Sequence, residues 1–308
     1  MARVLVVGGN GFIGSHVVDG LVRAGHDVVV FDRFSSGVAL YTSTVADTIV
    51  GDFLNRNDIA RAVEGVDVVL HFLSTTTPVT AHGDPSLDIT TNVAPTIELL
   101  RACVGAGVRR VVFASTGGAI YGPQDHSEYS EDDPALPVSP YGIGKLAIER
   151  YLAYFRATAG LESVSLRISN PFGPRQHLNR KQGLIPIALR QIAQGLPVTR
   201  YGDGSMVRDY VYVADLVDMV TPFVDRDVAH EVYNVGSGHG HTVTEVFDAL
   251  ARVTGVDFEI IEQPVPSTFV DRVVLNVDRL RAELGELTLT PLDEGIRATY
   301  REIERQVE

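Results

Sequence analysis

Short apolar runs alternate with segments of helical spacing along the first half of the chain. The runs are rich in β-branched residues and several are continuously apolar, which is typical of strands covered on both faces in a parallel sheet. The predicted strands are Val4–Val7, Asp27–Phe31, Thr48–Val50, Val66–His71 and Arg110–Ala114. The predicted helices between them are Phe12–Ala24, Asn57–Val63, Asn92–Val104 and Tyr141–Ala159. This order predicts a doubly wound α/β fold built on a parallel sheet with right-handed crossovers.

The pattern loosens after about residue 170, where glycine and proline cluster and short strands mix with helices. The strands predicted here are Val198–Tyr201, Asp209–Val213, Glu231–Val235 and Phe258–Ile261. The helices predicted here are Leu184–Ala193, Ala214–Val224, Val243–Val253 and Leu292–Arg305. We therefore expect two regions, residues 1–170 and a smaller α/β region of residues 171–308, with a soft boundary that strands can cross.

Composition and charge narrow the class of protein. The 308 residues are 45% hydrophobic and 21% charged, as in ordinary globular proteins, which excludes a disordered or fibrous chain. The 26 basic and 39 acidic residues give a formal net charge of −13, which argues against partners such as nucleic acid or an anionic membrane. An anionic ligand then needs a pocket in which backbone N–H groups and a few arginines outweigh the global charge.

The cysteine count and the N-terminus bear on the compartment. Cys103 is the only cysteine, so no intrachain disulfide forms and the fold does not depend on an oxidising compartment. The apolar run before Gly8 is too short for a signal-peptide core, and no stretch approaches the ~20 apolar residues that span a bilayer. We expect a cytoplasmic protein.

A glycine-rich turn follows the first predicted strand. Residues Gly8–Gly14 read Gly-Gly-Asn-Gly-Phe-Ile-Gly and fit a G-x-G-x-x-G pattern from Gly9 or a G-x-x-G-x-x-G pattern from Gly8. In both registers the glycines allow a tight turn and a close approach of the backbone to a pyrophosphate, while the next helix points its N-terminus at the phosphates. The residues predicted to bind a dinucleotide here are Gly8, Gly11, Phe12, Ile13 and Gly14.

Acidic residues at the ends of the next two strands support this interpretation. Asp32 ends the second strand at close to the ~20-residue spacing expected for a carboxylate that accepts from the adenosine ribose. Asp32 would repel a 2′-phosphate, so the predicted cofactor is NAD rather than NADP, on a Rossmann-type sheet. Asp52 and Phe53 follow the third strand, where the Asp52 carboxylate is placed to accept from the adenine amino group. His71 ends the fourth strand and is interpreted as a packing residue.

A tyrosine and a lysine four residues apart open the predicted helix that follows Ser139 and Pro140. Tyr141 and Lys145 share one helix face, so the phenol and the ammonium point into the same site. A free phenol has a pKa of about 10. A nearby ammonium, together with the positive nicotinamide of NAD⁺, favours the phenolate and makes it a working base. Lys145 is also placed to hold the nicotinamide ribose hydroxyls.

Taken together, these motifs resemble the extended short-chain dehydrogenases/reductases, in particular the NAD-dependent nucleotide-sugar epimerase/dehydratase family. The matching segments are Gly8–Gly14, Asp32, Asp52, Asn92, Ser115–Gly122, Tyr141 with Lys145, Arg167–Pro171 and Gly202–Asp215. Within the family the chain is most similar to UDP-sugar 4-epimerases. The resemblance implies a homodimer, paired through helices Asn92–Val104 and Tyr141–Ala159.

The resemblance also assigns roles at the sugar. The family places a hydroxyl after the fifth strand to bridge the sugar O4 and the tyrosine, and the candidates are Ser115 and Thr116. We expect Thr116 to be this catalytic hydroxyl and Ser115 to contact substrate. Dehydratases of the family carry an acidic pair next, whereas this chain has Gly117 and Gly118, so it lacks the acid that water loss requires.

The remaining substrate contacts expected from the resemblance lie in the second half. They are Asn170 and Arg208 at the diphosphate, with Leu184, Val198 and Tyr201 at the uracil and ribose. A second arginine usual in the family is displaced here, in Thr-Phe-Val-Asp-Arg, and Arg272 is the candidate replacement. Arg175 is a candidate partner for a uronate carboxylate. His239 and His241 lack a ligand cluster of metal-site spacing, so no metal is expected.

The predicted activity is reversible NAD-dependent inversion at C4 of a UDP-hexose or a UDP-hexuronate, through a 4-keto intermediate. A different outcome of the same oxidation, such as decarboxylation of a uronate or net reduction, is the alternative among enzymes. A non-catalytic NAD-binding regulator is the alternative from another class of protein. The motifs leave the choice between a neutral hexose and a uronate open.

Overall fold

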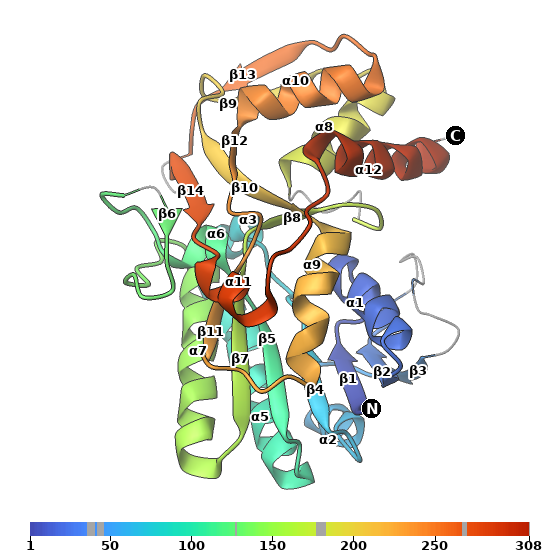
Figure 1. Ribbon diagram of the computed structural model, residues 1–308, viewed down its shortest axis with the longest axis vertical. Helices are drawn as coiled ribbons and strands as arrows, with labels where there is room; N and C mark the ends of the chain where they lie inside the picture. Colours follow the sequence, from blue (N-terminus) through green and yellow to red (C-terminus); the bar gives the residue numbers. More distant parts are fainter. Residues whose placement is uncertain (36–40, 42–45, 127, 177–182, 267–269, 308) are drawn as a thin grey trace.

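The computed structural model describes residues 1–35, 41, 46–126, 128–176, 183–266 and 270–307 (Figure 1). A seven-stranded sheet in which every pair of neighbours is parallel forms its centre. In spatial order the strands are β11 (Val232–Val235), β7 (Glu162–Ile168), β5 (Arg110–Thr116), β4 (Val68–His71), β1 (Arg3–Val7), β2 (Asp27–Asp32) and β3 (Asp47–Val50). From β1 the chain first adds β2 and β3 on one side of the sheet, and then adds β4, β5, β7 and β11 on the other. This arrangement confirms the doubly wound α/β prediction.

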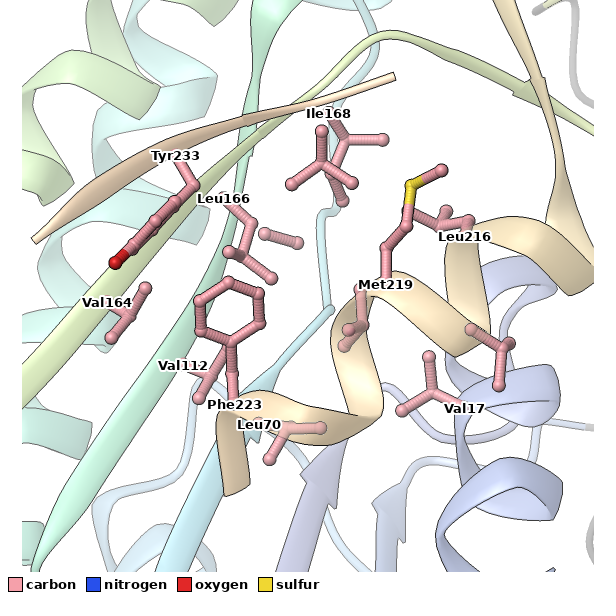
Figure 2. Close-up of a cluster of buried hydrophobic side chains, with 14 of the residues drawn as sticks. Val17, Leu70, Val112, Val164, Leu166, Ile168, Leu216, Met219, Phe223 and Tyr233 are labelled. Atoms are coloured by element: carbon pink, nitrogen blue, oxygen red, sulfur yellow. The ribbon is translucent and has the colours of Figure 1, made fainter. Parts of the chain in front are cut away.

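Alternate residues of each strand supply two hydrophobic cores, one on each face of the sheet. Val4 and Val6 pack with helices α1 (Phe12–Arg23) and α9 (Val213–Val220) and with the 3₁₀ turn η2 (Thr221–Val224). Figure 2 shows this core, with Phe223 and Met219 lying over side chains of β4, β5 and β7. The intervening Leu5 and Val7 pack with α2 (Arg56–Ala62), α5 (Ala94–Ala106) and α7 (Pro140–Ala159). Burial on both faces explains why these strands are continuously apolar.

A smaller α/β part lies beyond the carboxyl ends of the main strands (Figure 1). Its strands are β12 (Gly240–Thr242), β10 (Val207–Tyr212), β14 (Arg272–Leu275), β6 (Glu128–Tyr129) and β8 (Asn170–Phe172), together with the pair β9 (Val198–Tyr201) and β13 (Ile260–Gln263). Its helices are α8 (Leu184–Ala193), α10 (Val243–Thr254) and α12 (Leu292–Val307), which share a third core. Helix α11 (Asp278–Leu284) instead packs beside β11, and its Leu280 belongs to the core that contains Val4 and Val6. Strand β11 returns to the main sheet beside β7, and the division at residue 170 stays a prediction.

Prolines divide two of the predicted helices. The segment expected as Asn92–Val104 is a π-helical turn, η1 (Ile89–Val93), followed by α5, with Pro95 near the junction. The segment expected as Ala214–Val224 ends as an α-helix at Val220, and Pro222 lies in the 3₁₀ turn that follows. Proline lacks the N–H that an α-helical hydrogen bond requires, so the regular ladder changes at these points.

Several elements are absent from the predicted set. They are strands β6, β7, β8, β12 and β14 and the short helices α3 (Pro78–Gly83), α4 (Pro85–Asp88), α6 (Gly117–Ile120) and α11. Most are two to four residues long, too short to show a period. Strand β7 alternates Ser163, Ser165 and Arg167 with apolar residues although both of its faces are buried, which hides it from a pattern of apolar runs. Among the described residues, no helix has both the length and the apolar composition needed to cross a bilayer.

Candidate active site

The glycine turn between β1 and α1 is shaped by backbone contacts that only glycine permits. Gly8 has a φ of +84°, and its carbonyl oxygen accepts from the Gly11 N–H at 3.0 Å. A Cβ added at Gly14 would lie 2.2 Å from that oxygen, so the turn closes against the first turn of the helix. Gly11 is the N-cap residue of α1, and Phe12 and Ile13 follow as its first residues. This cradle at a helix N-terminus fits the pyrophosphate of a dinucleotide.

Asp32 lies at the end of β2, directly beside this turn. Its Oδ2 accepts from the Asn10 N–H at 3.2 Å, and its Oδ1 accepts from the Arg33 N–H at 2.7 Å. The carboxylate is therefore held in place next to the glycine cradle, as expected of a residue that accepts from ribose hydroxyls. Asp52 lies on the next loop, where its Oδ1 accepts from the Leu54 N–H at 2.9 Å. Its contact with adenine stays a prediction.

His71 lies in the interior, as the sequence interpretation has it. The ring is 2% exposed between Phe53 and Phe113, and its Nε2 lies 2.9 Å from the Thr96 hydroxyl. Burial lowers the pKa of His71 to about 3, with a further contribution from the Lys145 charge. The ring is therefore neutral, and it packs against Phe53.

The start of α7 brings the tyrosine–lysine pair to the carboxyl edge of the sheet. Ser139 caps the helix, because its hydroxyl accepts from the Gly142 N–H at 3.2 Å, and Pro140 is the first helical residue. A Cβ at Gly142 would lie 2.4 Å from the Ala119 carbonyl oxygen. Glycine at this position lets α7 approach α6, the short helix that continues β5, so Tyr141 lies beside the end of β5.

Lys145 is buried and directed at the same edge. Its ammonium donates to the Ala114 carbonyl oxygen at 2.8 Å and lies 5.7 Å from the centre of the Tyr141 ring. Burial lowers the pKa of Lys145 to about 8, although the negative charges of Asp88 and Glu149 oppose this shift. The ammonium is thus close to the phenol, as the helical spacing predicts, and it has one backbone partner.

The Tyr141 phenol is harder to ionise than an ordinary tyrosine. Burial raises its pKa, and the negative charge of Asp88 raises it further. In the protein by itself the phenol is therefore protonated at neutral pH. The positive charge of an oxidised nicotinamide, named in the sequence argument, would favour the phenolate. Within the described chain the Tyr141 hydroxyl has no hydrogen-bond partner, which leaves it available to a ligand.

The two candidate hydroxyls at the end of β5 have different surroundings. Ser115 donates to Glu149 Oε1 at 2.6 Å, and the Glu149 carboxylate also forms an ion pair with Arg167 at 2.9 Å. Consecutive strand residues face opposite ways, and Ser115 faces α7 with its hydroxyl engaged by Glu149, which argues against the expected contact with substrate. Thr116 faces the other way, and its hydroxyl bonds to no residue in the described part of the chain. A Cβ at Gly117 would lie 2.4 Å from Leu275 Cδ1, so a side chain there would require Leu275 to move.

Asn170 and Arg208 come from adjoining strands of the smaller sheets. Asn170 donates from Nδ2 to the Asp209 carbonyl oxygen at 2.8 Å, and its Oδ1 lies 3.8 Å from where a Cβ of Gly118 would be. Asn170 therefore lies at the edge that carries Thr116. The partly buried Arg208 donates from Nη1 to the carbonyl oxygens of Val207 at 2.8 Å and Asp271 at 3.3 Å.

Strand register separates Arg272 from Arg208. In the parallel pair β10–β14, Val207 lies opposite Arg272 and Arg208 lies opposite Val273. Paired residues project from the same face of a sheet, so the two arginines project from opposite faces. This register argues against Arg272, which is exposed, as the second diphosphate contact. Thr268 and Phe269 of the same sequence motif lie outside the described residues.

The three residues expected at the uracil differ in burial. Val198 is 1% exposed and packs in the core formed by α8, α10 and α12, which indicates a packing role rather than a ligand contact. Leu184 is partly buried at the start of α8, and Tyr201 is 41% exposed at the end of β9. Leu184 and Tyr201 therefore stay predictions.

Arg175 has a partner away from the sugar site. Its Nη2 forms an ion pair with Asp19 of α1 at 2.7 Å, and its backbone N–H donates to Glu302 of α12 at 2.7 Å. The guanidinium also lies over the Tyr41 ring, 5.6 Å from its centre. These contacts tie α1 to the smaller part of the molecule and argue against the carboxylate clamp expected of Arg175.

Two buried acids beside Lys145 were not found by sequence reasoning. Asp88 is 3% exposed and Glu149 is 8% exposed, and both act on the Lys145 charge. The sequence signal that pointed to such a neighbour was Gly144. A glycine inside a helix lowers helix stability by about 1 kcal/mol, so its presence indicates that another group packs closely against that position. Within the described ranges, no cluster of three or more His, Cys, Asp or Glu side chains has a metal-holding arrangement.

These features define a Rossmann-type dehydrogenase site of the short-chain class, with a dinucleotide cradle and a tyrosine–lysine pair at one edge of a parallel sheet. The model of the NAD dependent epimerase/dehydratase family matches residues 4–236, and the chain belongs to this family. The prediction of NAD as the cofactor is thereby confirmed.

Similar proteins cover the whole chain. A UDP-glucose 4-epimerase of Mycolicibacterium smegmatis is 34% identical over 96% of this chain and 97% of its own length. The crystal structure of a UDP-glucose 4-epimerase of Thermotoga maritima with UDP-glucose has a TM-score of 0.94 and 33% identity, covering 99% of this chain and 100% of that one. A UDP-glucose 4-epimerase of Thermus thermophilus in complex with NAD has a TM-score of 0.91 and 36% identity, with 98% of both chains covered.

Proposed function

We propose that this protein catalyses the reversible NAD-dependent 4-epimerisation of a UDP-sugar. The observation that carries the proposal is the Tyr141–Lys145 pair at the carboxyl edge of the sheet. The same edge carries the free Thr116 hydroxyl and the dinucleotide cradle. The full-length similarity to UDP-glucose 4-epimerases supports the same reaction. NAD supplies, when bound, the acceptor for a hydride from the sugar carbon and the donor for its return.

The chain's own residues hold the substrate and move its proton. Tyr141, as phenolate, takes the proton of the sugar O4, directly or through Thr116, and returns it after the 4-keto intermediate has turned its other face. Lys145 keeps positive charge beside the phenol and is placed to hold the nicotinamide ribose. Gly14 and Asp32 would orient the dinucleotide. The reaction has no net redox change, because the sugar regains the hydride that it gives up.

The diphosphate is held by Asn170 and Arg208 in this proposal. Asn170 lies at the edge that carries Thr116, and Arg208 lies on β10, the strand that pairs with the strand of Asn170. The guanidinium N–H groups of Arg208 suit phosphate oxygens. A neutral UDP-hexose is favoured over a UDP-hexuronate, because Arg175, the candidate carboxylate partner, is paired with Asp19. Parallel incubations with UDP-glucose and UDP-glucuronate decide between the two substrates through the 4-epimer that accumulates.

We further propose a cytoplasmic homodimer. Ile143, Tyr151 and Tyr154 form an exposed, largely apolar stripe along α7, and Ile89 and Val104 are exposed on the neighbouring helices. A second copy of the chain would bury this stripe, which matches the helix pairing implied by the family. Light scattering should give twice the chain mass, and Tyr154→Arg should reduce it to that of a monomer.

Replacement of the phenol tests the proposed reaction. Tyr141→Phe should lower kcat/KM for UDP-glucose by at least about 1000-fold, because it removes the general base, while NAD binding measured by calorimetry stays within about threefold. Turnover in the unchanged protein but not in the variant supports the epimerase. Intact NAD binding without turnover of any UDP-sugar by the unchanged protein would instead favour the non-catalytic regulator.

A further inference from the structure

Asp88 is a buried carboxylate that packs directly against the helix carrying the catalytic pair. It ends α4 and is 3% exposed. A Cβ at Gly144 would lie 1.5 Å from Asp88 Oδ2, so the carboxylate occupies the space that a side chain between Tyr141 and Lys145 would fill. Gly144, inside α7 and one residue before Lys145, lowers the stability of the helix. This cost suggests that the close packing of Asp88 has a role that compensates for it.

Neutral groups hold Asp88 in this position. Its Oδ1 accepts from the Thr76 hydroxyl and from Asn92 Nδ2, the latter at 2.9 Å. The π-helical turn Ile89–Val93 places Asn92 on the side of Asp88, and Asn92 Oδ1 accepts from the Thr75 N–H at 2.9 Å. No arginine, lysine or histidine in the described chain forms an ion pair with Asp88, whereas Glu149 on the other side of Lys145 is paired with Arg167. The Asp88 charge therefore acts on Tyr141 and Lys145 without being neutralised.

The surroundings contain few other charges. Tyr141, Lys145 and Glu149 lie on α7, and neutral His71 lies at the end of β4. His82 and Asp84, on the segment that leads to α4, are exposed to solvent, which screens them. Asp88 raises the pKa of both Tyr141 and Lys145, so one carboxylate favours the protonated form of each group.

We propose that Asp88, packed against Gly144, is a positioning residue that favours the charged Lys145 ammonium and adds to the burial that keeps the Tyr141 phenol protonated until the positive charge of the oxidised cofactor is in place. The base is then switched on by cofactor binding rather than by pH alone. This inference rests on the proposed function for its effect on turnover, and it goes beyond that function by assigning the charge balance of the pair to a residue outside the tyrosine–lysine motif.

The Lys145 amine gives a direct readout that needs neither cofactor nor substrate. The chain has two lysines, Lys145 and Lys181, so selective isotopic labelling of lysine gives two amine titrations by NMR. Lys181→Arg leaves one and assigns it. We expect the pKa of Lys145 to be about 8 in the unchanged protein and about one unit lower in Asp88→Asn, because the opposite charge is gone. Asp84→Asn, an exposed aspartate on the same segment, is the matched control and should leave it unchanged.

Turnover supplies the second readout. With the Asp88 charge removed, the phenol ionises more readily, so the acid limb of kcat/KM should move to lower pH by about one unit, and the alkaline limb should follow as Lys145 loses its proton earlier. A purely structural role would lower the rate at every pH and move neither limb.

A lower pKa of Lys145 in Asp88→Asn supports the inference. An unchanged Lys145 titration in Asp88→Asn overturns it. If Asp88→Asn does not fold, the double variant Asp88→Ala/Gly144→Ala makes the same change of charge, with the added methyl taking the place of the carboxylate. Failure of the unchanged protein to turn over any UDP-sugar would count against the proposed function alone, since the Lys145 titration still tests Asp88.

Discussion

The cofactor side and the substrate side of this active site are built in different ways. On the cofactor side, Gly8 and Gly14 act through the backbone of one short turn that its own atoms close, and the Asp32 carboxylate accepts from the Asn10 N–H of that turn. On the substrate side, Asn170, Arg208 and Arg272 come from three strands whose pairing decides which face each side chain leaves. A short motif therefore predicts the first side, whereas the second depends on a register that the motif does not contain.

The largest effect is expected from a substitution that adds a methyl group to the cofactor cradle. Gly14→Ala would place Cβ 2.2 Å from the Gly8 oxygen, and the backbone must shift to relieve the contact. NAD affinity measured by calorimetry should fall at least about 100-fold. Gly105→Ala on α5, where an added Cβ meets nothing within 4 Å, is the control and should bind NAD normally. Unchanged affinity in Gly14→Ala would show that the cradle does not hold the dinucleotide.

The register argument predicts unequal losses from the two arginines. Arg208→Ala should lower kcat/KM for the UDP-sugar roughly 10- to 100-fold, because it removes charged hydrogen bonds to the diphosphate. Arg272→Ala should change it by less than about threefold, since Arg272 leaves the opposite face of the sheet. Equal losses in steady-state assays of the two variants would break the contrast between local motif and strand pairing.

Substitutions of the two adjacent hydroxyl residues at the end of β5 should have smaller effects, and the two effects should differ in kind. Thr116→Val should lower kcat by about tenfold with little change in stability, because the free hydroxyl is the proposed bridge to the sugar O4. Ser115→Ala should instead lower the free energy of unfolding by about 1–3 kcal/mol and leave kcat nearly unchanged, since Ser115 serves the buried Glu149. Denaturant titrations and initial rates on both variants would reveal the reverse assignment.

The smallest effect is expected at Arg175. Its ion pair with Asp19 is partly exposed, so Arg175→Ala should cost at most about 1 kcal/mol of unfolding free energy. Rates with UDP-glucose and UDP-glucuronate should change by the same factor, less than about threefold. A loss confined to the uronate in parallel rate measurements would restore the carboxylate clamp and contradict the position seen here.

The fold was predictable where burial leaves a continuous apolar run or a helical period of apolar residues in the sequence. Strands β1, β2, β4 and β5 are apolar on both faces, and the long helices carry one apolar side, so their existence follows from the pattern. Strand β7 escaped because Ser163, Ser165 and Arg167 are buried against α7, where Glu149 pairs with Arg167. A buried ion pair satisfies polar side chains that the sequence pattern assigns to solvent.

The sequence by itself determined the dinucleotide turn, the preference for NAD and the Tyr141–Lys145 pair, because each depends on a short motif or, for Asp32, on a carboxylate at the end of the next strand. Only the tertiary structure showed that Ser115 serves Glu149, that Arg175 pairs with Asp19, and that Arg272 leaves the wrong face. It also brought Asp88 against Gly144, across 56 positions of the chain. Electrostatic effects act through distances in space, and those distances are decided by the packing of helices and the register of strands rather than by neighbouring residues in the chain.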